Sequence, residues 1–334
     1  MPKPSPQNQY NKTMDATPLV SIITPSYNQD AYLEHTILSV LYQDYPNLEY
    51  WVMDGGSTDS SIRILNKYSQ RLTGWVSEKD GGQADGINKG LSQAKGGIVA
   101  WLNSDDVYLP GAIQGAVEAF QKYPTAPFVY SDVNSIDEKG RFFHRMRYGD
   151  WGLKDLMTFH IIGQPGVFMR REALESAGYL NTGLQYLLDH ELWLRLAALG
   201  EPRHIPGVVW ASARVHAGAK NVAQAEGFGP EAYQIARWIG TEKRFYPMNA
   251  RFRKRIWAGA HRLNAFYLVE AGKPKDALRM YRESAHLNPL VALKDWRRIA
   301  YAAISALGVR NARKPFDWLR LKLRGHRAKA NKEA

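Results

Sequence analysis

The sequence predicts an α/β domain built on a mainly parallel sheet, followed by an α-helical C-terminal region. In the first 110 residues, short apolar runs alternate with segments of helical periodicity, which is the pattern of strands joined by crossover helices. From residue 127 to 170 strand-like runs continue in a looser pattern, which indicates a mixed extension of the sheet. Beyond Thr241 the composition changes to long basic stretches of helix-forming residues.

The individual elements follow from local patterns. Residues 19–24 are almost continuously apolar, as expected of a strand covered on both faces. Asp30 can cap the helix that follows, and Ser57 or Thr58 can cap the next. Further strands are predicted at residues 48–53, 74–77, 98–102, 128–133, 141–147 and 166–169, and further helices at 84–94 and 188–199.

Three segments are predicted in the 334 residues. Residues 1–17 are a polar leader, expected to be flexible, that lacks the apolar core of a signal peptide. Residues 18–235 form the α/β domain, and residues 236–334 form the basic helical region, with the change of character close to the Gly227–Pro230 punctuation. The longest apolar run near the C-terminus, residues 299–309, is about half the roughly 20 residues that span a bilayer, so no transmembrane helix is predicted.

Composition limits the possible chemistry. The chain has no cysteine, which excludes a disulfide scaffold, a cysteine-ligated metal and a cysteine nucleophile. The formal charge of +12 is unevenly distributed, because residues 241–334 hold 23 Lys and Arg against 7 Asp and Glu. That region therefore carries +16 and residues 1–240 carry −4, so the excess lies outside the α/β domain.

Carboxylates follow two of the predicted strands. Asp54 ends the second strand, and Asp105 and Asp106 come just after the fourth. In an open parallel sheet the carboxyl ends of the strands form the ligand crevice. Two adjacent carboxylates repel each other, and a divalent cation relieves that repulsion. A turn or a helix cap is the alternative explanation for the adjacent pair.

Four motifs, taken in order, resemble family 2 glycosyltransferases of the bacterial surface-glycan type. These are residues 24–28 (TPSYN), 54–59 (DGGSTD), 103–106 (NSDD) and 189–195 (DHELWLR). The resemblance covers roughly residues 18–220 and implies an inverting enzyme with the GT-A fold, a mixed Rossmann-like sheet flanked by helices. It also implies a nucleotide-sugar donor and a glycan or lipid-linked glycan as the acceptor.

The resemblance assigns nucleotide-binding roles to several residues. Pro25, Ser26 and Tyr27 are expected to line the nucleotide pocket. Asp54 is expected to hydrogen-bond the base edge, usually uracil. Asp85 is expected to contribute to the nucleotide or donor-sugar pocket.

The same resemblance implies a Mg²⁺ or Mn²⁺ site. Asp106 is expected to be the direct ligand and Asp105 to lie nearer the ribose or sugar. His216 falls where some relatives place a histidine close to the metal, although a structural role is an equal alternative. Asn103 departs from the family pattern, in which many members carry a further acid.

Asp189 matches the position of the family's general base. Its proton transfer from an acceptor hydroxyl would contribute about 10²–10⁴-fold to the rate. The alternative is an acid favoured by the dipole at a helix N-terminus. Residues 164–166 (QPG) are expected to shape the acceptor side or a tight turn, and Trp101 and Trp193 to belong to the core. Glu191 and Arg195 can form an exposed ion pair.

The basic region offers two further features. Residues 263–289 resemble one tetratricopeptide-type helical hairpin. Residues 318–327 interleave apolar and basic side chains, which suits either an interfacial segment on anionic lipid or a solvated tail.

The favoured function is therefore a cytoplasmic, metal-dependent transferase that can associate with the inner face of the membrane and extends a surface glycan such as lipopolysaccharide. Two alternatives are a basic nucleic-acid-binding protein and a catalytically silent scaffold. The position of the charge outside the motif-bearing domain disfavours the first, and the Asp105, Asp106 and Asp189 positions disfavour the second.

Overall fold

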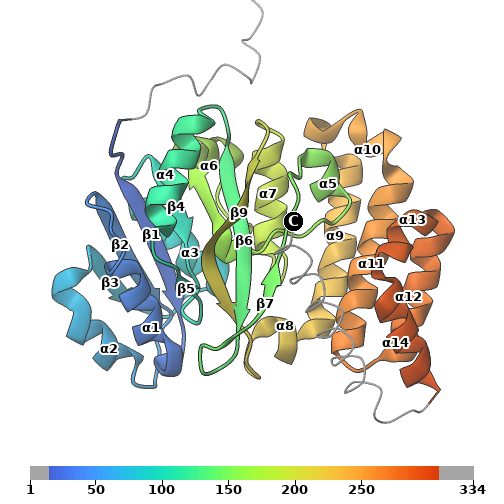
Figure 1. Cartoon of the computed structure of the whole chain (residues 1–334), viewed down its shortest axis with the longest axis horizontal. Coiled ribbons are helices and arrows are strands. Elements are labelled where there is room, and N and C mark those ends of the chain that lie inside the picture. The colour runs from blue at the N-terminus through green and yellow to red at the C-terminus, as the bar shows by residue number, and fades with distance from the viewer. Residues whose placement is uncertain (1–14, 308–334) are drawn as a thin grey trace, which may run out of the picture. The chain divides into compact units, whose positions relative to one another are not determined.

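A computed structural model describes residues 15–307 of the chain and divides it into two compact units, with the division at Ala219 and Lys220 (Figure 1). The predicted boundary at residue 235 falls later, inside the helix Phe228–Thr241. The interfacial segment predicted at residues 318–327 lies outside the described residues. Within residues 15–307, no helix is both long enough and apolar enough to cross a membrane.

The first unit is a nine-stranded sheet with helices on both faces. Its strands are β1 (Val20–Ser26), β2 (Leu48–Asp54), β3 (Gly74–Ser77), β4 (Ile98–Trp101), β5 (Val107–Tyr108), β6 (Phe128–Ile136), β7 (Phe142–Met146), β8 (Val167–Arg170) and β9 (Arg203–Arg214). Its α-helices are α1 (Asp30–Leu41), α2 (Ser61–Tyr68), α3 (Gln83–Gln93), α4 (Ala112–Lys122), α5 (Leu153–Met157), α6 (Arg171–Ala177) and α7 (Leu188–Ala197).

The sheet is mixed, as predicted. Its strand order is β3-β2-β1-β4-β8-β6-β9-β5, with β7 paired to β6. Neighbouring strands within the group β1 to β4 pair in parallel. Strand β8 pairs antiparallel with β4 on one side and with β6 on the other. The parallel half places the ends of β1, β2 and β4 along one edge of the sheet, where ligands bind in folds of this kind (Figure 1).

Alternating side chains explain how both faces of the sheet are covered. Val20 and Ile22 of β1 belong to one buried cluster with residues of α1, α2 and α4. Ile23 points to the opposite face, where α3 approaches so closely that a Cβ on Gly90 would lie 2.5 Å from the Ile23 side chain. A glycine at this helix position therefore permits the close contact between helix and sheet.

Two strands escape prediction from the sequence. β9 is a 12-residue strand whose middle, around Pro206 and Gly207, is exposed, and its pairing with β6 shifts register between Ser131 and Val133. Interrupted alternation of this kind hides a strand from pattern analysis. β5 has only two residues and depends on β9 for its pairing.

The predicted helix caps are also wrong. α2 begins at Ser61, so neither Ser57 nor Thr58 caps it. Asp30 is the first residue of α1, and its side chain accepts a hydrogen bond from the Ser60 amide instead. Asp30 and Ser57 each accept a hydrogen bond from a backbone amide of the other loop. These bonds between loops take the place of the local capping bonds.

Helix α7 is anchored by its buried side chains. Trp193 stacks on Trp101 of β4 at a centroid distance of 5.3 Å, so both are core residues as predicted. The pair Glu191–Arg195 is buried rather than exposed, with side chains 8% and 9% accessible. Arg195 also donates to the carbonyls of Ala177 and Gly178 at the end of α6. The tertiary contact with α6 therefore decides the burial of an ion pair that helical spacing alone predicts.

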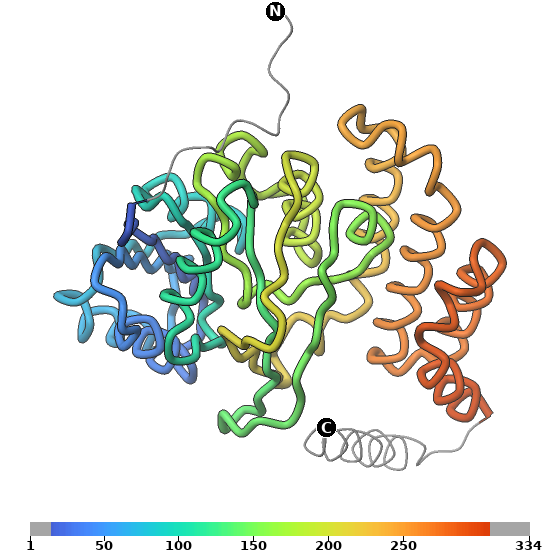
Figure 2. The backbone as a smooth tube through the Cα atoms, turned by 45° about the horizontal axis from the view of Figure 1, so that its top comes forward, coloured from blue at the N-terminus to red at the C-terminus, as the bar shows by residue number. Residues whose placement is uncertain are grey.

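The second unit is helical throughout its described part. Its helices are α8 (Lys220–Ala223), α9 (Phe228–Thr241), α10 (Met248–Arg251), α11 (Arg253–Glu270), α12 (Pro274–Leu287), α13 (Pro289–Ala292) and α14 (Trp296–Ala306), with 3₁₀ turns at Ala225–Gly227, Lys243–Phe245 and Leu293–Asp295. Helices α11 and α12 form a hairpin whose turn contains Gly272 at φ 74° (Figure 2). Ala265, Tyr281 and Ala302 share a small core, so α14 packs on this hairpin.

Replacing Arg195 with Met tests the buried ion pair. The substitution leaves the Glu191 carboxylate buried without its cation, which typically costs about 3–5 kcal/mol. We expect the free energy of unfolding, measured by urea denaturation, to fall by that order. Arg141→Met is the matched control, because the Asp137–Arg141 pair has the same spacing with side chains 31% and 73% accessible. Its loss should cost at most about 1 kcal/mol, and an equal effect of both variants would contradict this interpretation.

Candidate functional site

The ends of the parallel strands bring the predicted nucleotide-pocket residues together. Ser26 of β1 is in register with Asp54 of β2, and Asp54 is in register with Ser77 of β3. Pro25 and Ser26 are buried, whereas Tyr27 is 60% exposed at the start of the loop. The Ser26 hydroxyl is buried without a hydrogen-bond partner in the described structure. These residues therefore lie together at the carboxyl ends of β1, β2 and β3.

Asp54 organises the loop that follows β2. Its Oδ2 accepts hydrogen bonds from the amides of Gly56 and Ser57 at 3.1 and 2.8 Å and from Ser77 Oγ at 2.7 Å. Its Oδ1 accepts from Ser57 Oγ at 2.5 Å. The carboxylate is 3% accessible, so these donors replace its hydration shell. Asp54 therefore fixes the shape of the loop next to the pocket.

Asn28 ties together the loops that follow β1 and β2. Its backbone is left-handed, with φ 51°, and its amide donates to Ser57 Oγ at 2.8 Å. Its Oδ1 accepts from the Thr58 amide at 2.8 Å. Asn tolerates this backbone conformation better than most residues, which suits it to the position. The β1–α1 and β2–α2 loops consequently form one wall.

Asp80 lies beside the β2–α2 loop and the turn before α3, and no sequence motif identifies it. Its Oδ1 accepts from the Gly82 amide at 2.8 Å. Cβ atoms added to Gly55 or Gly86 would lie 2.9 Å from its Oδ2, so this carboxylate fits only because both neighbours are glycines. The signal available in the sequence was an acid immediately before a Gly-Gly turn.

Asp85 lies in the first turn of α3. The Gly81 amide donates to its Oδ2 at 2.9 Å and, together with Lys89, holds the pKa of this carboxyl below its ordinary value. Because this hydrogen bond stabilises the turn before α3, Asp85 shapes the Gly81–Gln83 segment at the crevice.

Asn103 connects two parts of the edge. Its Oδ1 accepts a hydrogen bond from Gln83 Nε2 at 2.8 Å. Its side chain also hydrogen-bonds Asp106 and thereby favours the charged form of that carboxyl. A neutral amide can accept from one partner and donate to the other, which a carboxylate cannot do. This dual role accounts for an amide where the family pattern has an acid.

Asp105 is paired with His216. Its Oδ2 lies 3.0 Å from His216 Nε2, and the two side chains are 21% and 8% accessible. Strand β5 pairs antiparallel with β9, so the end of β9 returns to the loop after β4. Arg214 secures the same junction, because its Nε donates to the carbonyl of Asp105 at 2.9 Å. His216 and Asp105 are thus brought together across 111 residues of sequence.

Asp106 lies behind Asp105. It is 4% accessible, and its Oδ1 accepts from the Arg214 amide at 2.9 Å. Burial and the neighbouring Asp105 charge raise the pKa of the Asp106 carboxyl well above its ordinary value. Asp105 therefore presents the more accessible of the two carboxylates.

Asp189 lies on α7, whose packing places it near the same edge. It is four residues before Trp193, which stacks on Trp101 at the end of β4. Gln185, which precedes α7, lies close to Gly82 at the start of α3. Asp189 is partly buried. Burial of Tyr148 raises the pKa of its hydroxyl, and the nearby charges of Asp132 and Asp189 raise it further. Asp189 thus shares its surroundings with the segment that leads from β7 to α5.

Gln164 lies beside the end of β4. It belongs to a 3₁₀ turn, Gln164–Gly166, and its Nε2 donates to the carbonyl of Trp101 at 2.6 Å. Its Oε1 is buried without a hydrogen-bond partner in the described structure. The turn predicted at Pro165-Gly166 is therefore present, and it is fixed to the end of β4.

The residues present fit a divalent cation bound with help from its substrate. Among residues 15–307, no three His, Asp or Glu side chains gather closely enough to enclose a metal. Mg²⁺ and related ions are commonly held by one or two carboxylates together with substrate phosphates. Asp105 offers an accessible carboxylate oxygen, which suits Mg²⁺ or Mn²⁺, beside the His216 imidazole, and a diphosphate would complete the coordination.

Comparison with known proteins supports a glycosyl-transfer site. Residues 21–178 match the model of Glycosyl transferase family 2. Chondroitin synthase of Escherichia coli is 27% identical over 196 residues, covering 58% of this chain and 28% of that protein. Hyaluronan synthase of Pasteurella multocida is 27% identical over 195 residues, 58% of this chain and 20% of that protein. The matched part thus spans less than a third of either synthase.

Solved structures share the fold. TarS 1–349 of S. aureus in complex with UDP superposes with a TM-score of 0.61 at 19% identity, covering 87% of this chain and 92% of that chain. The mannosyltransferase PcManGT from Pyrobaculum calidifontis, in complex with GDP-Man and Mn²⁺, gives 0.59 at 20% identity, with 96% and 86% covered. These similarities establish the GT-A type of fold with a helical C-terminal region.

His190, next to Asp189, provides a test of how tightly this part of the site is packed. The side chain is fully buried and stacks on Phe159, and burial lowers its pKa to about 3. Because an unfolded histidine protonates near pH 6.5, the folded state should lose stability as the pH falls below that value. Between pH 7.5 and 5 the loss from this one residue should be about 2 kcal/mol.

The variant His190→Phe should flatten that pH dependence, since it removes the titrating group and keeps an aromatic ring against Phe159. The measurement is the free energy of unfolding in urea at pH 7.5, 6.0 and 5.0. Equal pH dependence in the wild type and the variant would contradict the lowered pKa of His190, because it would mean that folding leaves this pKa unchanged.

Proposed function

Since the chain carries a family 2 glycosyltransferase domain, we propose that it moves a sugar from a nucleoside diphosphate donor, with UDP favoured, to a hydroxyl of a glycan or lipid-linked glycan, with inversion at the anomeric carbon. The observation that carries the proposal is the Asp105–His216 pair, held at the edge of the sheet that also carries Asp54. The structural neighbours crystallised with UDP and with GDP-Man and Mn²⁺ support a nucleotide-sugar donor.

The nucleoside would lie between the ends of β1 and β2. Asp54 holds the β2–α2 loop through four hydrogen bonds and keeps a fixed outline for the base. Pro25 and Ser26 would form the floor of the pocket, and the exposed Tyr27 ring would cover it. Asp80 and Asp85 would position the Gly81–Gln83 turn against the donor.

The diphosphate would lie beside Asp105 and His216. A Mn²⁺ or Mg²⁺ held by these two residues would stabilise the negative charge that develops on the leaving group. The family motif predicts Asp106 as the direct ligand, but the burial of Asp106 favours Asp105 in that role, with Asp106 supporting the loop. Arg214 keeps both carboxylates in place through its amide and its guanidinium.

Asp189 would act as the general base. An acceptor hydroxyl becomes a competent nucleophile when its proton moves to a positioned carboxylate as the new bond forms. The electron pair of the broken glycosidic bond leaves with the nucleoside diphosphate, and the proton remains on Asp189. A single displacement of this kind inverts the anomeric configuration and requires no covalent intermediate.

The relatives that synthesise chondroitin and hyaluronan support a polysaccharide as the product class. The excess of basic residues after position 240 supports an association with an anionic membrane surface, where a lipid-linked acceptor would be found.

Asp189→Asn should abolish turnover and preserve nucleotide binding. Loss of the proton acceptor should reduce kcat by about 10²–10⁴-fold, whereas the donor pocket is unchanged. Turnover is measured by release of the nucleoside diphosphate, and binding by calorimetry with UDP and Mn²⁺. Asp150→Asn is the matched control, since this aspartate of the same unit is 63% exposed, and its contacts are a 3.8 Å ion pair with Arg203 and a 3.3 Å hydrogen bond from the His204 amide, which an Asn oxygen can also accept. Unchanged turnover in Asp189→Asn would remove it as the base.

A thermal-shift screen over UDP, GDP, TDP and CMP, with and without Mn²⁺, tests the donor class. A nucleotide present at about 100 times its Kd stabilises the folded state by about 2.7 kcal/mol. Because each kcal/mol raises Tm by about 2–4 °C in a domain of this size, the expected rise in Tm is about 5–11 °C. We expect the shift for UDP to require Mn²⁺ and to disappear in His216→Gln. A shift that persists without the metal and in this variant would contradict the assigned metal site.

A further inference from the structure

A group of basic residues in the second unit is unexplained by the transferase site. It lies at the junction of α9, α10 and α11, between residues 243 and 255, and is called the 243–255 surface below. Residues 243–269 include no Asp or Glu at all. The cations of this surface are Lys243, Arg244, Arg251, Arg253, Lys254 and Arg255, all exposed.

Most of these cations have no acidic partner in the described structure. Arg244 pairs with Glu242 at 3.2 Å. No ion pair within residues 15–307 involves the other five. By contrast, several exposed cations on neighbouring segments have acidic partners, as Lys273 has in Glu226 and Arg282 in Glu283. The 243–255 surface is therefore an uncompensated positive patch.

The position of the patch is unfavourable for the fold itself. Arg253, Lys254 and Arg255 form the first turn of α11, and no acidic residue lies in that turn. The N-terminus of a helix carries partial positive charge, so cations there cost stability, typically a few tenths of a kcal/mol or more each. Packing does not explain the basic residues either, because these three side chains are exposed. An external anion would offset the repulsion.

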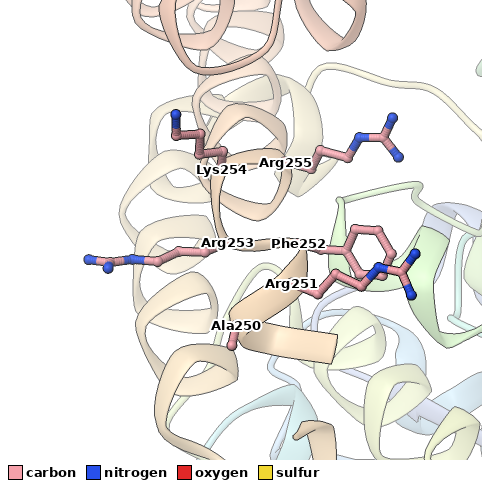
Figure 3. A pocket seen from close by; sticks show the side chains of 6 residues that line it. All are labelled: Ala250, Arg251, Phe252, Arg253, Lys254 and Arg255. Atoms are coloured by element: carbon pink, nitrogen blue, oxygen red, sulfur yellow. The ribbon is translucent and has the colours of Figure 1, made fainter. Parts of the chain in front are cut away.

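The side chains spread out rather than enclose a single ligand. Figure 3 shows Arg251 and Arg255 extending to the same side as the Phe252 ring, and Arg253 and Lys254 extending to the other side. Together with Ala250 they line an open hollow of about 590 Å³. A small anion would contact only a few of these cations at once. An extended anionic surface could contact the cations on both sides.

Aromatic side chains accompany the cations. Tyr246 is 73% exposed, and the partly buried Phe252 ring lies within 5.4 Å of the Arg251 guanidinium. Amphipathic rings beside basic residues are typical of segments that lie at the headgroup level of a bilayer. This combination favours a lipid surface over a soluble polyanion.

We propose that the 243–255 surface binds the headgroups of an anionic phospholipid bilayer. The 243–255 surface would be the part of the described chain through which the protein contacts the membrane. This proposal rests on the membrane association given under the proposed function. It is independent of residues 318–327 and of the transferase chemistry, since binding to vesicles requires neither donor nor turnover.

The test is sedimentation of the full chain with vesicles of phosphatidylcholine alone or with about 30% phosphatidylglycerol. The wild type should bind the anionic vesicles and not the neutral ones. The triple variant Arg251→Gln/Arg253→Gln/Lys254→Gln should bind about tenfold more weakly or worse, since each basic residue near the surface contributes to the attraction. Its Tm should be unchanged or higher, because the repulsion in the first turn of α11 is removed.

The matched control is Lys273→Gln/Arg279→Gln/Arg282→Gln, which removes the same charge from exposed cations that have acidic partners. It should bind within about twofold of the wild type. Equal loss in both triple variants would overturn the proposal by showing an effect of net charge alone. Full binding by the first triple variant would also overturn it, as would binding of heparin through these residues with no binding to either vesicle. UDP-induced thermal shifts in the same variants report on the transferase site separately.

Discussion

The antiparallel pairing of β5 with β9 is the constraint on which the candidate site depends. It returns the chain to the loop after β4 and brings Arg214 and His216 to the adjacent carboxylates Asp105 and Asp106. Without these partners, two neighbouring negative charges at the end of a buried strand would repel each other. Val107↔Ser212 and Tyr108↔Ala211 are the only residue pairs in this ladder of the described chain, so a very short pairing has a large consequence.

Burial then separates the two carboxylates by role. Asp106 is enclosed and supports the loop, and Asp105 remains accessible beside an imidazole. Asn103 contributes to this division because its amide bonds to Gln83 and to Asp106 without adding a third charge. An Asn at position 103, where the family pattern has an acid, therefore avoids a third negative charge beside Asp105 and Asp106. The same principle explains Asp54, whose four donors make it a determinant of loop shape.

The uneven charge of the chain has a structural counterpart. The region after residue 240 carries +16, yet many of its cations are paired with acids on neighbouring helices, as Arg262 is with Asp295. Five of the cations that lack an ion pair in the described residues lie between Lys243 and Arg255, which concentrates uncompensated charge in that segment. The proposed catalytic site and the proposed lipid-binding surface thus lie in different units of the chain.

The sequence by itself determined the α/β class, the positions of most strands, and the motifs at their ends, because apolar runs and turn residues are local signals. Parallel order then placed Asp54 and Asp105 at one edge. Only the tertiary structure decided which carboxylate is accessible, that Glu191 and Arg195 are buried, and that β9 exists as one bulged strand. These features depend on contacts between residues far apart in sequence, and burial, which sets their electrostatics, is a property of the packed fold rather than of any local pattern.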